Sequence, residues 1–264
     1  MAFDMNNFVI DRIVRGVALS QKDDSVLFSI NQIQNASLNC ASESTDAVDA
    51  MGTPIATFYR AKTAEFSAEN ALFDMNLMAT QLGTSKTVAS AAKKVVVPAM
   101  ESFEVAEGGK YVLKHAPIAA PSEIYAIERD STFGKKYVKA TSASADAFAY
   151  VEADHTITLP TGLAAGTEMF VMYEYESENA VEVVNSAKNF PVGCKFVMEV
   201  LGCDVCDQTN LVYAYVIFNN AKLSPDFDWS IATDGAHPFS MKAQQDYCDK
   251  EKRLFSIVIP GDQE

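Results

Sequence analysis

The sequence has few basic residues and no long apolar run. Its 264 residues include 21 Lys and Arg against 35 Asp and Glu, a formal net charge of -14 with a pI near 4.6. A surface that grips nucleic-acid phosphates needs clustered Lys and Arg. The composition therefore argues against nucleic-acid binding, although it is compatible with a surface that DNA passes without adhering. No stretch approaches the roughly 18 apolar residues that cross a bilayer.

The N-terminal residues lack the pattern of an export signal. MAFDMNNFVIDRIV carries acidic side chains where an export signal has a basic start and then an apolar stretch. We therefore expect no export signal and no membrane partner. Hydrophobic residues make up 48% and charged residues 21% of the chain, which is ordinary for a globular protein. A chain of this length forms one large domain or two modest ones.

Cysteines are few and do not form a metal-ligand pattern. Cys203 and Cys206 form one C-x-x-C pair, and Cys40, Cys194 and Cys248 form no second pair, whereas a structural zinc takes four ligands. A thioredoxin-like site needs the pair at a helix N-terminus, but here it follows one strand-like run and precedes another. The pattern favours thiols beside a turn, and the odd number of cysteines favours reduced thiols in a cytoplasmic setting.

Catalytic signatures are missing as well. The sequence has no P-loop, no G-x-G-x-x-G and no nucleophile-elbow motif. His115, His155 and His237 each lie beside a Gly- or Pro-containing segment, so surface or turn positions are expected for all three. We predict that the chain is not an enzyme and has no catalytic, cofactor-binding or metal-binding residues.

What the sequence does contain is strand patterning, beginning in its first third. FVIDRIVRGVAL mixes apolar and charged residues, and its period alone fits a strand or a short helix. SVLFSINQIQNASLNCASES has β-branched residues, with alternation through Val26, Phe28 and Ile30. SESTDAVDAMGTP, residues 42–54, has the Ser, Asp, Gly and Pro density of a loop. Such a long loop in a compact domain is usually functional or ordered by a partner.

A second strand pair and one helix are predicted next. IATFYRAKTAEFSAEN is interpreted as two strands with a turn near Ala61. An apolar stripe then predicts a helix over 71–82, with Ser67 or Asn70 as its N-cap and Gly83 as its end.

The middle third has a different texture. Frequent Gly and Pro residues separate short strand-like runs at 111–114, 123–127, 136–139, 148–151, 156–159 and 169–175. Residues 98–185 hold 14 Asp and Glu against 6 Lys and Arg, a net charge of -8 within the total of -14. Such a shift in composition indicates a separate module, and this one is predicted to be a small all-β domain. The last third returns to longer strands in CKFVMEVLG and LVYAYVIFNNAKL, with CDVCDQTN as the turn between them.

Two stretches carry a resemblance to a known family. VLFSINQIQNASLNCASESTDAVDAMGTPIATFYRAKTAEFSAENALFDMNLMATQLG resembles the N-terminal half of tail tube (major tail) proteins of long-tailed bacteriophages, and WSIATDGAHPFSMKAQQDYCDKEKRLFSIVIP resembles their closing strands. The resemblance covers about 1–95 and 185–264. It implies a mainly β fold: two packed antiparallel sheets, a tail-tube-like sandwich or barrel with one flanking helix, formed by 1–97 and 185–264. Residues 98–184 would then be an inserted Ig-like β domain that projects outward.

The same resemblance implies a function in assembly. Subunits would form homohexameric rings that stack into a hollow tube in the virion tail, after synthesis in the bacterial host cytoplasm. DNA would pass through the tube without specific binding. Partners would be other copies of the chain, the tape measure protein, the tail tip or baseplate and the tail terminator. The loop at 42–54 would contact the neighbouring ring, which assigns an assembly role to Ser42, Thr45, Asp46, Asp49, Met51, Gly52 and Pro54.

Two other classes of function stay open at this point. A head-decoration, baseplate or carbohydrate-binding β module of a virion is favoured if the inserted domain exposes a cluster of aromatic residues. An enzyme with a site assembled from distant residues is favoured if mutation of a buried acid or of Cys248 abolishes a measured activity.

Overall fold

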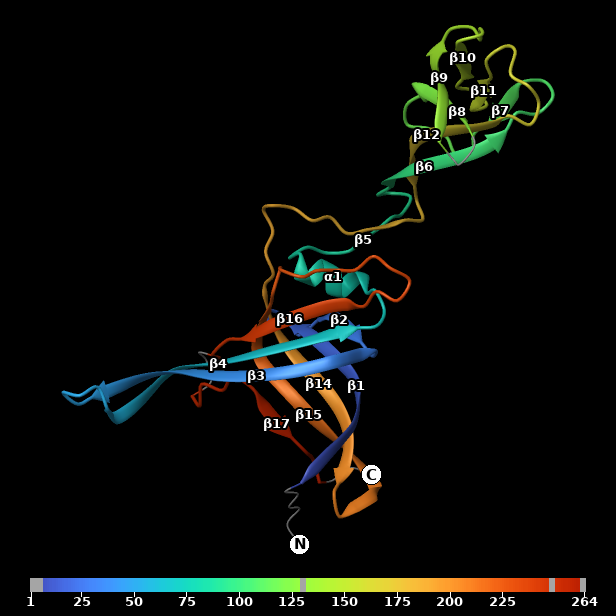
Figure 1. The fold of residues 1–264 in the computed structure, drawn as a ribbon. Coiled ribbons are helices and arrows are strands. Elements are labelled where there is room, and N and C mark those ends of the chain that lie inside the picture. The colour runs from blue at the N-terminus through green and yellow to red at the C-terminus, as the bar shows by residue number, and fades with distance from the viewer. Residues whose placement is uncertain (1–6, 129–131, 247–249, 262–264) are drawn as a thin grey trace. The chain divides into compact units, whose positions relative to one another are not determined.

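The computed structural model describes residues 7–128, 132–246 and 250–261. The chain divides into two compact units: unit 1 comprises Met1–Lys86 with Val183–Glu264, and unit 2 comprises Thr87–Glu182. Both units are built almost wholly from β-strands (Figure 1). The predicted mainly β fold with one flanking helix is confirmed.

Unit 1 holds one antiparallel sheet of eight strands. Its order is β2-β1-β14-β15-β16-β4-β3, and β17 pairs with β15 beside β16. The strands are β1 (Phe8–Ser20), β2 (Val26–Ile30), β3 (Ile33–Val48), β4 (Pro54–Asn70), β14 (Gly193–Asp204), β15 (Asp207–Leu223), β16 (His237–Ala243) and β17 (Ser256–Val258). The strands β14, β15 and β16 from the C-terminal part of the chain therefore lie between two pairs of N-terminal strands, β2-β1 and β4-β3.

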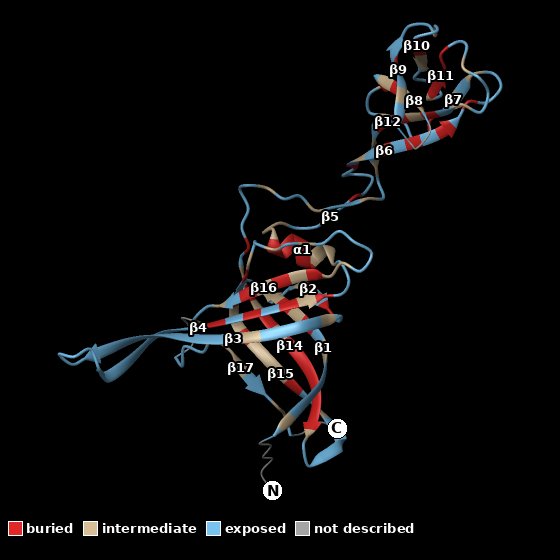
Figure 2. Cartoon of the chain, in the orientation of Figure 1, coloured by how far each residue is buried: buried red, intermediate tan, exposed pale blue. Residues whose placement is uncertain are grey.

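The sheet curls so that its two halves pack on a shared phenylalanine core. The ring of Phe66 on β4 lies 5.7 Å from that of Phe196 on β14 and 5.9 Å from that of Phe218 on β15, although neither strand neighbours β4. A Cβ on Gly16 of β1 would lie 2.8 Å from the side chain of Ile33 on β3, which shows how closely the two ends of the sheet approach. The predicted layers are thus the halves of one curled sheet, with the buried face inside (Figure 2). Burying each such phenylalanine stabilises the fold by about 1.5–3 kcal/mol.

The helix α1 (Met75–Gln81) is shorter than the predicted 71–82 and has a different cap. The carboxylate of Asp74 accepts hydrogen bonds from two backbone N–H groups of the first turn, as an N-cap residue does. The predicted caps are wrong because β4 continues through them: Ser67 and Asn70 both pair with residues of β16. The ladder between β4 and β16 therefore delays the start of the helix.

Two other predicted features differ in unit 1. The turn predicted near Ala61 is a β-bulge inside β4, where Ala61 has a φ of 47°. A bulge gives one residue an unusual conformation without ending the strand. WSIATDG forms no strand in the described structure, and its Trp229 stacks on Phe73 with ring centroids 4.3 Å apart.

Unit 2 has a sheet of seven strands around its own core. The order is β6-β12-β8-β9-β10-β11-β7, and β9 and β10 are parallel. The strands are β6 (Val95–Glu104), β7 (Lys110–Val112), β8 (Glu123–Ile127), β9 (Phe133–Ala140), β10 (Ala147–Val151), β11 (Thr156–Thr158) and β12 (Glu168–Ser177). Ile124, Phe148, Ile157 and Met169 are completely buried at its centre. The predicted boundary after residue 97 falls inside β6.

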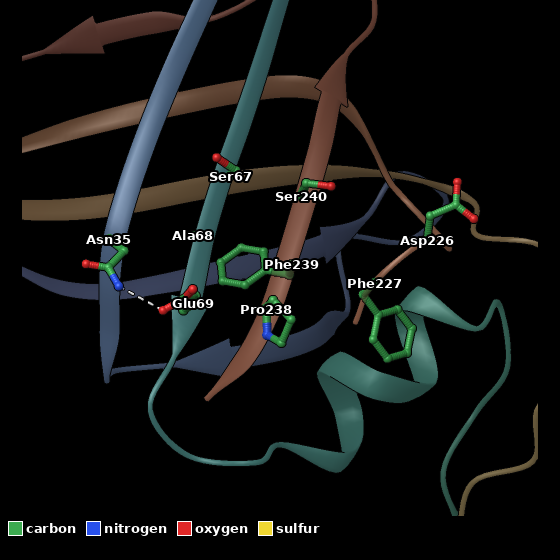
Figure 3. A pocket seen from close by; sticks show the side chains of 9 residues that line it. All are labelled: Asn35, Ser67, Ala68, Glu69, Asp226, Phe227, Pro238, Phe239 and Ser240. Atoms are coloured by element: carbon green, nitrogen blue, oxygen red, sulfur yellow. Dashed lines mark hydrogen bonds between the residues drawn. The ribbon is translucent and has the colours of Figure 1, made fainter. Parts of the chain in front are cut away.

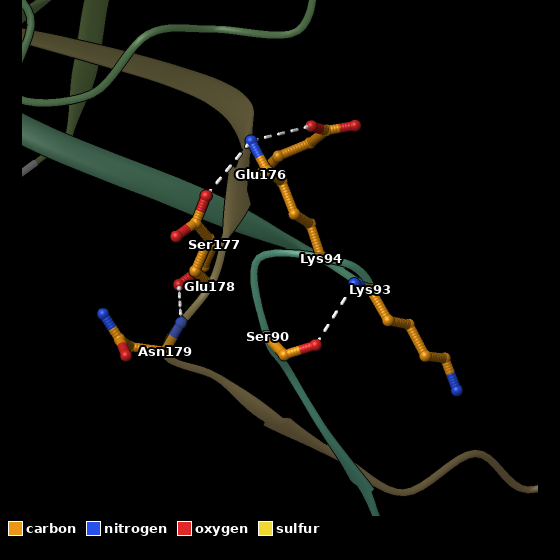
Figure 4. A network of polar contacts seen from close by, with 7 residues as sticks. All are labelled: Ser90, Lys93, Lys94, Glu176, Ser177, Glu178 and Asn179. Atoms are coloured by element: carbon orange, nitrogen blue, oxygen red, sulfur yellow. Dashed lines mark hydrogen bonds and ion pairs between the residues drawn. The ribbon is translucent and has the colours of Figure 1, made fainter.

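The segments that open and close unit 2 are tied to each other. β5 (Thr87–Val88) pairs with β13 (Val181–Glu182), and the Nζ of Lys94 lies 3.7 Å from Glu176 and 3.4 Å from Glu178 (Figure 4). These ion pairs are exposed, and exposed pairs contribute little, so the backbone ladders are the main tie. The first and last residues of unit 2 therefore lie side by side in space, although they are far apart in the sequence.

Candidate assembly surfaces

The most distinctive surface of unit 1 is a two-stranded extension of β3 and β4. Every residue from 39 to 63, which we call the arm, is exposed. The two strands pair along this whole length (Figures 1 and 2). The predicted loop at 42–54 is therefore wrong: most of it is strand. Because neither face of the arm is buried, its sequence lacks the apolar alternation that marks a strand.

The seven predicted assembly residues all lie on the arm. They occupy strand β3, the tip turn or the first position of β4: Ser42, Thr45, Asp46, Asp49, Met51, Gly52 and Pro54. The tip is well ordered by hydrogen bonds, since Oδ1 of Asp49 accepts from the backbone N of Met51 at 2.8 Å and of Thr53 at 2.9 Å. Gly52 has a φ of 85°, which favours glycine. The arm thus ends in a compact turn.

Large apolar side chains lie exposed along the arm. They include Val48, Met51, Ile55, Phe58 and Tyr59. Phe58 is 55% and Tyr59 72% exposed, and as successive strand residues they point to opposite faces. A two-stranded hairpin alone is at best marginally stable in water, and contiguous exposed apolar surface marks an interaction site. Both faces of the arm are therefore suited to contact a partner.

Two inner strands of the curled sheet, β1 and β15, are paired on one edge over only part of their length. β1 pairs with β14 along its length, but β2 covers its other edge only from Gly16 to Leu19. β15 pairs with β17 and β16 only from Tyr215 onward. Within the described part of the chain, the ladders thus give residues 8–15 of β1 and 207–212 of β15 no strand partner on one edge. Unpaired edges are templates for pairing with another chain.

These surfaces agree with the comparison against family models. A family model described as the YomU/Tube protein family covers residues 8–253. The chain belongs to the YomU/Tube protein family. This is a family of structural phage tube proteins and not a family of enzymes. No curated protein sequence matches the chain.

The cysteines that the structure describes in this tube-family chain do not assemble into a metal site. Cys203 is buried near the end of β14, whereas Cys206 is exposed in the turn before β15. That turn is only two residues long, shorter than the predicted CDVCDQTN, because pairing continues on both sides of it. The described residues contain no group of three or more His, Cys, Asp or Glu that could hold a metal, and Cys248 lies outside them.

His237 departs from the prediction of a surface or turn position, because it is completely buried. Its Nε2 lies 2.8 Å from Oε1 of Gln81, whose Nε2 donates to the carbonyl of Pro238 at 3.1 Å. The amide orientation makes Nε2 of His237 the donor. Burial lowers the pKa of His237, and Asp74 raises it in part. We interpret this neutral histidine as part of the core beneath α1, and no local sequence signal indicates it.

An open pocket on the outer face of β3, β4 and β16 holds no catalytic arrangement. It has a volume of about 210 Å³, and Phe227 forms part of its wall (Figure 3). Nδ2 of Asn35 donates to Glu69 at 2.8 Å. Ser67 and Ser240 also line the pocket, but no lysine, histidine or cysteine does, so neither hydroxyl has a neighbouring base of these types. The described residues also contain no helix long and apolar enough to cross a membrane.

Proposed function

We propose that this chain is the tail tube subunit of a long-tailed bacteriophage. Copies form hexameric rings, the rings stack into a tube in the virion tail, and the tube conducts DNA during delivery. Membership of a tube family supports the structural role. The observation that carries the proposal is the arm, whose exposed apolar residues on both faces suit contact with other copies.

Ring formation accounts for the free edges of unit 1. Unpaired strand edges promote uncontrolled association unless they are covered. Residues 8–15 of one copy and 207–212 of the next can be covered in a closed ring, where the same contact repeats around a symmetry axis. Each ring then leaves its arms available for stacking.

The charge of the chain suits passage of DNA. The residues outside 98–185 carry -6 of the formal net charge of -14, and an excess of acidic groups disfavours binding of a phosphate backbone. The subunit is made in the host cytoplasm and assembles with the tape measure protein, the tail tip or baseplate and the terminator. No membrane partner is part of the proposal.

Sedimentation velocity of the purified chain at rising concentration tests this function. The wild type is expected to form rings and longer assemblies. A variant in which residues 43–60 are replaced by a two-residue Asn-Gly turn removes most of the arm and leaves the sheet, so it is expected to stop at rings or single copies. A wild type that stays a single copy at every concentration contradicts the proposal.

A second candidate function applies to unit 2 and rests on a separate observation. Phe133 is 57% exposed, and its ring lies 4.8 Å from Phe170 and 5.4 Å from Tyr125. An exposed aromatic cluster marks a contact surface and favours a head-decoration, baseplate or carbohydrate-binding module. Retention of the chain on immobilised host cell-wall polysaccharide, lost in Phe133→Ala, is expected for this candidate. No retention of the wild type removes it.

A further inference from the structure

A groove lies at the base of the arm, where the sheet ends and the extension begins. It has a volume of about 320 Å³, and we call it the basal groove. Both strands of the arm base and the C-terminal segment contribute to its lining, which includes Cys40, Ser42, Lys62, Ala64, Leu254 and Phe255. The groove lies wholly within unit 1.

The floor of the groove continues the hydrophobic core of unit 1. Cys40 is directly opposite Ala64, two positions from the buried Phe66, so this pair shares the core-facing side of the strands. The ring of Phe255 lies 5.8 Å from that of Phe218 in the core. The apolar layer of the core therefore extends beneath the first residues of the arm, where Cys40 is exposed.

The tip of the arm complements this groove in its apolar side chains and its charge. Val48, Met51 and Ile55 expose apolar side chains there, and Met51 is 91% exposed. Asp46 adds a negative charge near the tip, and Lys62 supplies a positive charge in the groove. Neither of these charged groups has an ion-pair partner within the residues that the structure describes. The arm tip is therefore apolar with an acidic residue beside it, and the basal groove is apolar with a basic residue beside it.

An arm cannot satisfy its own groove. From residue 39 at its base to residue 48 near its tip, the arm is about 33 Å long at the usual rise per residue. The basal groove lies at the base, so the tip of the same arm is remote from it. Contact between tip and groove must therefore join two copies. Since the two surfaces differ, a row of such contacts is head-to-tail, and a growing row keeps one free tip at one end and one free groove at the other.

We propose that the arm tip of one copy docks in the basal groove of a second copy, with Met51 as the apolar anchor and Asp46 facing Lys62. This proposal rests on the proposed function, because it names the contact through which the arm propagates the assembly. It makes the C-terminal segment at Leu254 and Phe255 part of the receiving surface.

Disulfide cross-linking tests the contact, because Cys40 already lies in the groove. The variant Met51→Cys is made with Cys206→Ser and Cys248→Ser, so that Cys40 is the remaining exposed native thiol in the described chain. Assemblies formed under reducing conditions are then oxidised with copper phenanthroline. A disulfide needs the two Cβ atoms within about 4.5 Å. The expected product on a non-reducing gel is a ladder of dimers, trimers and longer species.

Two controls make the ladder specific. Adding Cys40→Ser is expected to abolish it. Val205→Cys in place of Met51→Cys puts an exposed thiol in the hairpin turn between β14 and β15 and is expected to give no ladder with Cys40. Products that persist with Cys40→Ser report two tips meeting, and the absence of any product that depends on Cys40 contradicts the proposal.

Electron microscopy of the same samples tests the docking of the tip in the basal groove separately from the proposed tube function. Tubes or rings without a ladder overturn the docking of the tip in the basal groove and leave the proposed function intact. A wild type without tubes or rings overturns both.

Discussion

Glu101 is a buried carboxylate in unit 2 that is stabilised by hydrogen bonds alone in the described structure. It accepts from the hydroxyl of Tyr111 at 2.6 Å, from the backbone N of Lys114 at 3.2 Å and from the hydroxyl of Tyr173. Burial, together with the bonds to Glu101, raises the pKa of Tyr111 to about 12 and that of Tyr173 as well. Both tyrosines therefore remain protonated donors at neutral pH.

Tyr173→Phe is expected to destabilise unit 2 by about 1.5–3 kcal/mol, because a buried carboxylate loses a charge-assisted hydrogen bond. The backbone N of His115, which donates to the Tyr173 hydroxyl at 3.0 Å, loses its acceptor too. The matched control is Tyr125→Phe, which removes a tyrosine bond to the half-exposed Glu123 and is expected to change stability by less than about 0.5 kcal/mol. Equal urea unfolding curves for the wild type and Tyr173→Phe would show that the network contributes nothing.

His237 predicts a pH dependence of unit 1. Burial lowers its pKa below the ordinary 6.5, so the unfolded chain binds a proton more readily than the folded one. Its contribution to stability is complete above about pH 6.5 and is lost as the pH falls toward the lowered pKa. His237→Gln keeps a donor near Gln81 and cannot titrate, so the fall in urea midpoint from pH 7 to pH 5 is expected to be smaller than in the wild type. His155→Gln, in a turn of unit 2, is the control and is expected to retain the full fall.

At the scale of elements, the sequence indicates strands best where one face is buried. β8 at Glu123–Ile127 matches its predicted range, and β14 shows clear alternation through Phe196, Met198 and Val200. The sequence of the arm does not indicate a strand, because neither face packs on the core of its own chain and no apolar alternation is required. The bulge at Ala61 resembles a turn in sequence because only the ladder decides whether the strand continues.

The candidate site was only partly accessible from sequence. Polar density at 42–54 predicts the place of an assembly element, and the tip residues lie there. The basal groove depends on Leu254 and Phe255 lying beside Cys40 and Ala64, which are far away in the sequence. Such convergence follows from the closing of the sheet and has no local signal.

The arm allows assembly to be separated from folding. Phe58→Ser with Tyr59→Ser is expected to change the free energy of unfolding by less than about 1 kcal/mol, because both side chains are mostly exposed. The same pair is expected to raise the protein concentration needed for assembly at least tenfold, since aromatic anchors dominate interfaces. Ile231→Ser, at an 85% exposed position in the loop before β16, is the control and is expected to alter neither quantity. Unchanged assembly of the double variant in light scattering would remove the arm from the interface.

At the scale of the whole molecule, charge opposes association. Copies with a formal net charge of -14 repel one another, and salt screens that repulsion over a Debye length of about 10 Å at 0.1 M. Light scattering is therefore expected to show more assembly at 0.5 M than at 0.05 M NaCl. Assembly that falls as salt rises would show that attraction between opposite charges, such as Asp46 and Lys62, dominates the association.

Negative-stain electron microscopy of the purified chain at high concentration, with its mass in solution measured in parallel, tests the central claim most directly. If copies assemble into a tube, hollow tubes or six-fold rings are expected, with a mass that grows with concentration. A monodisperse single copy with no particles, even after a tail-tip complex is added to start assembly, would contradict the account.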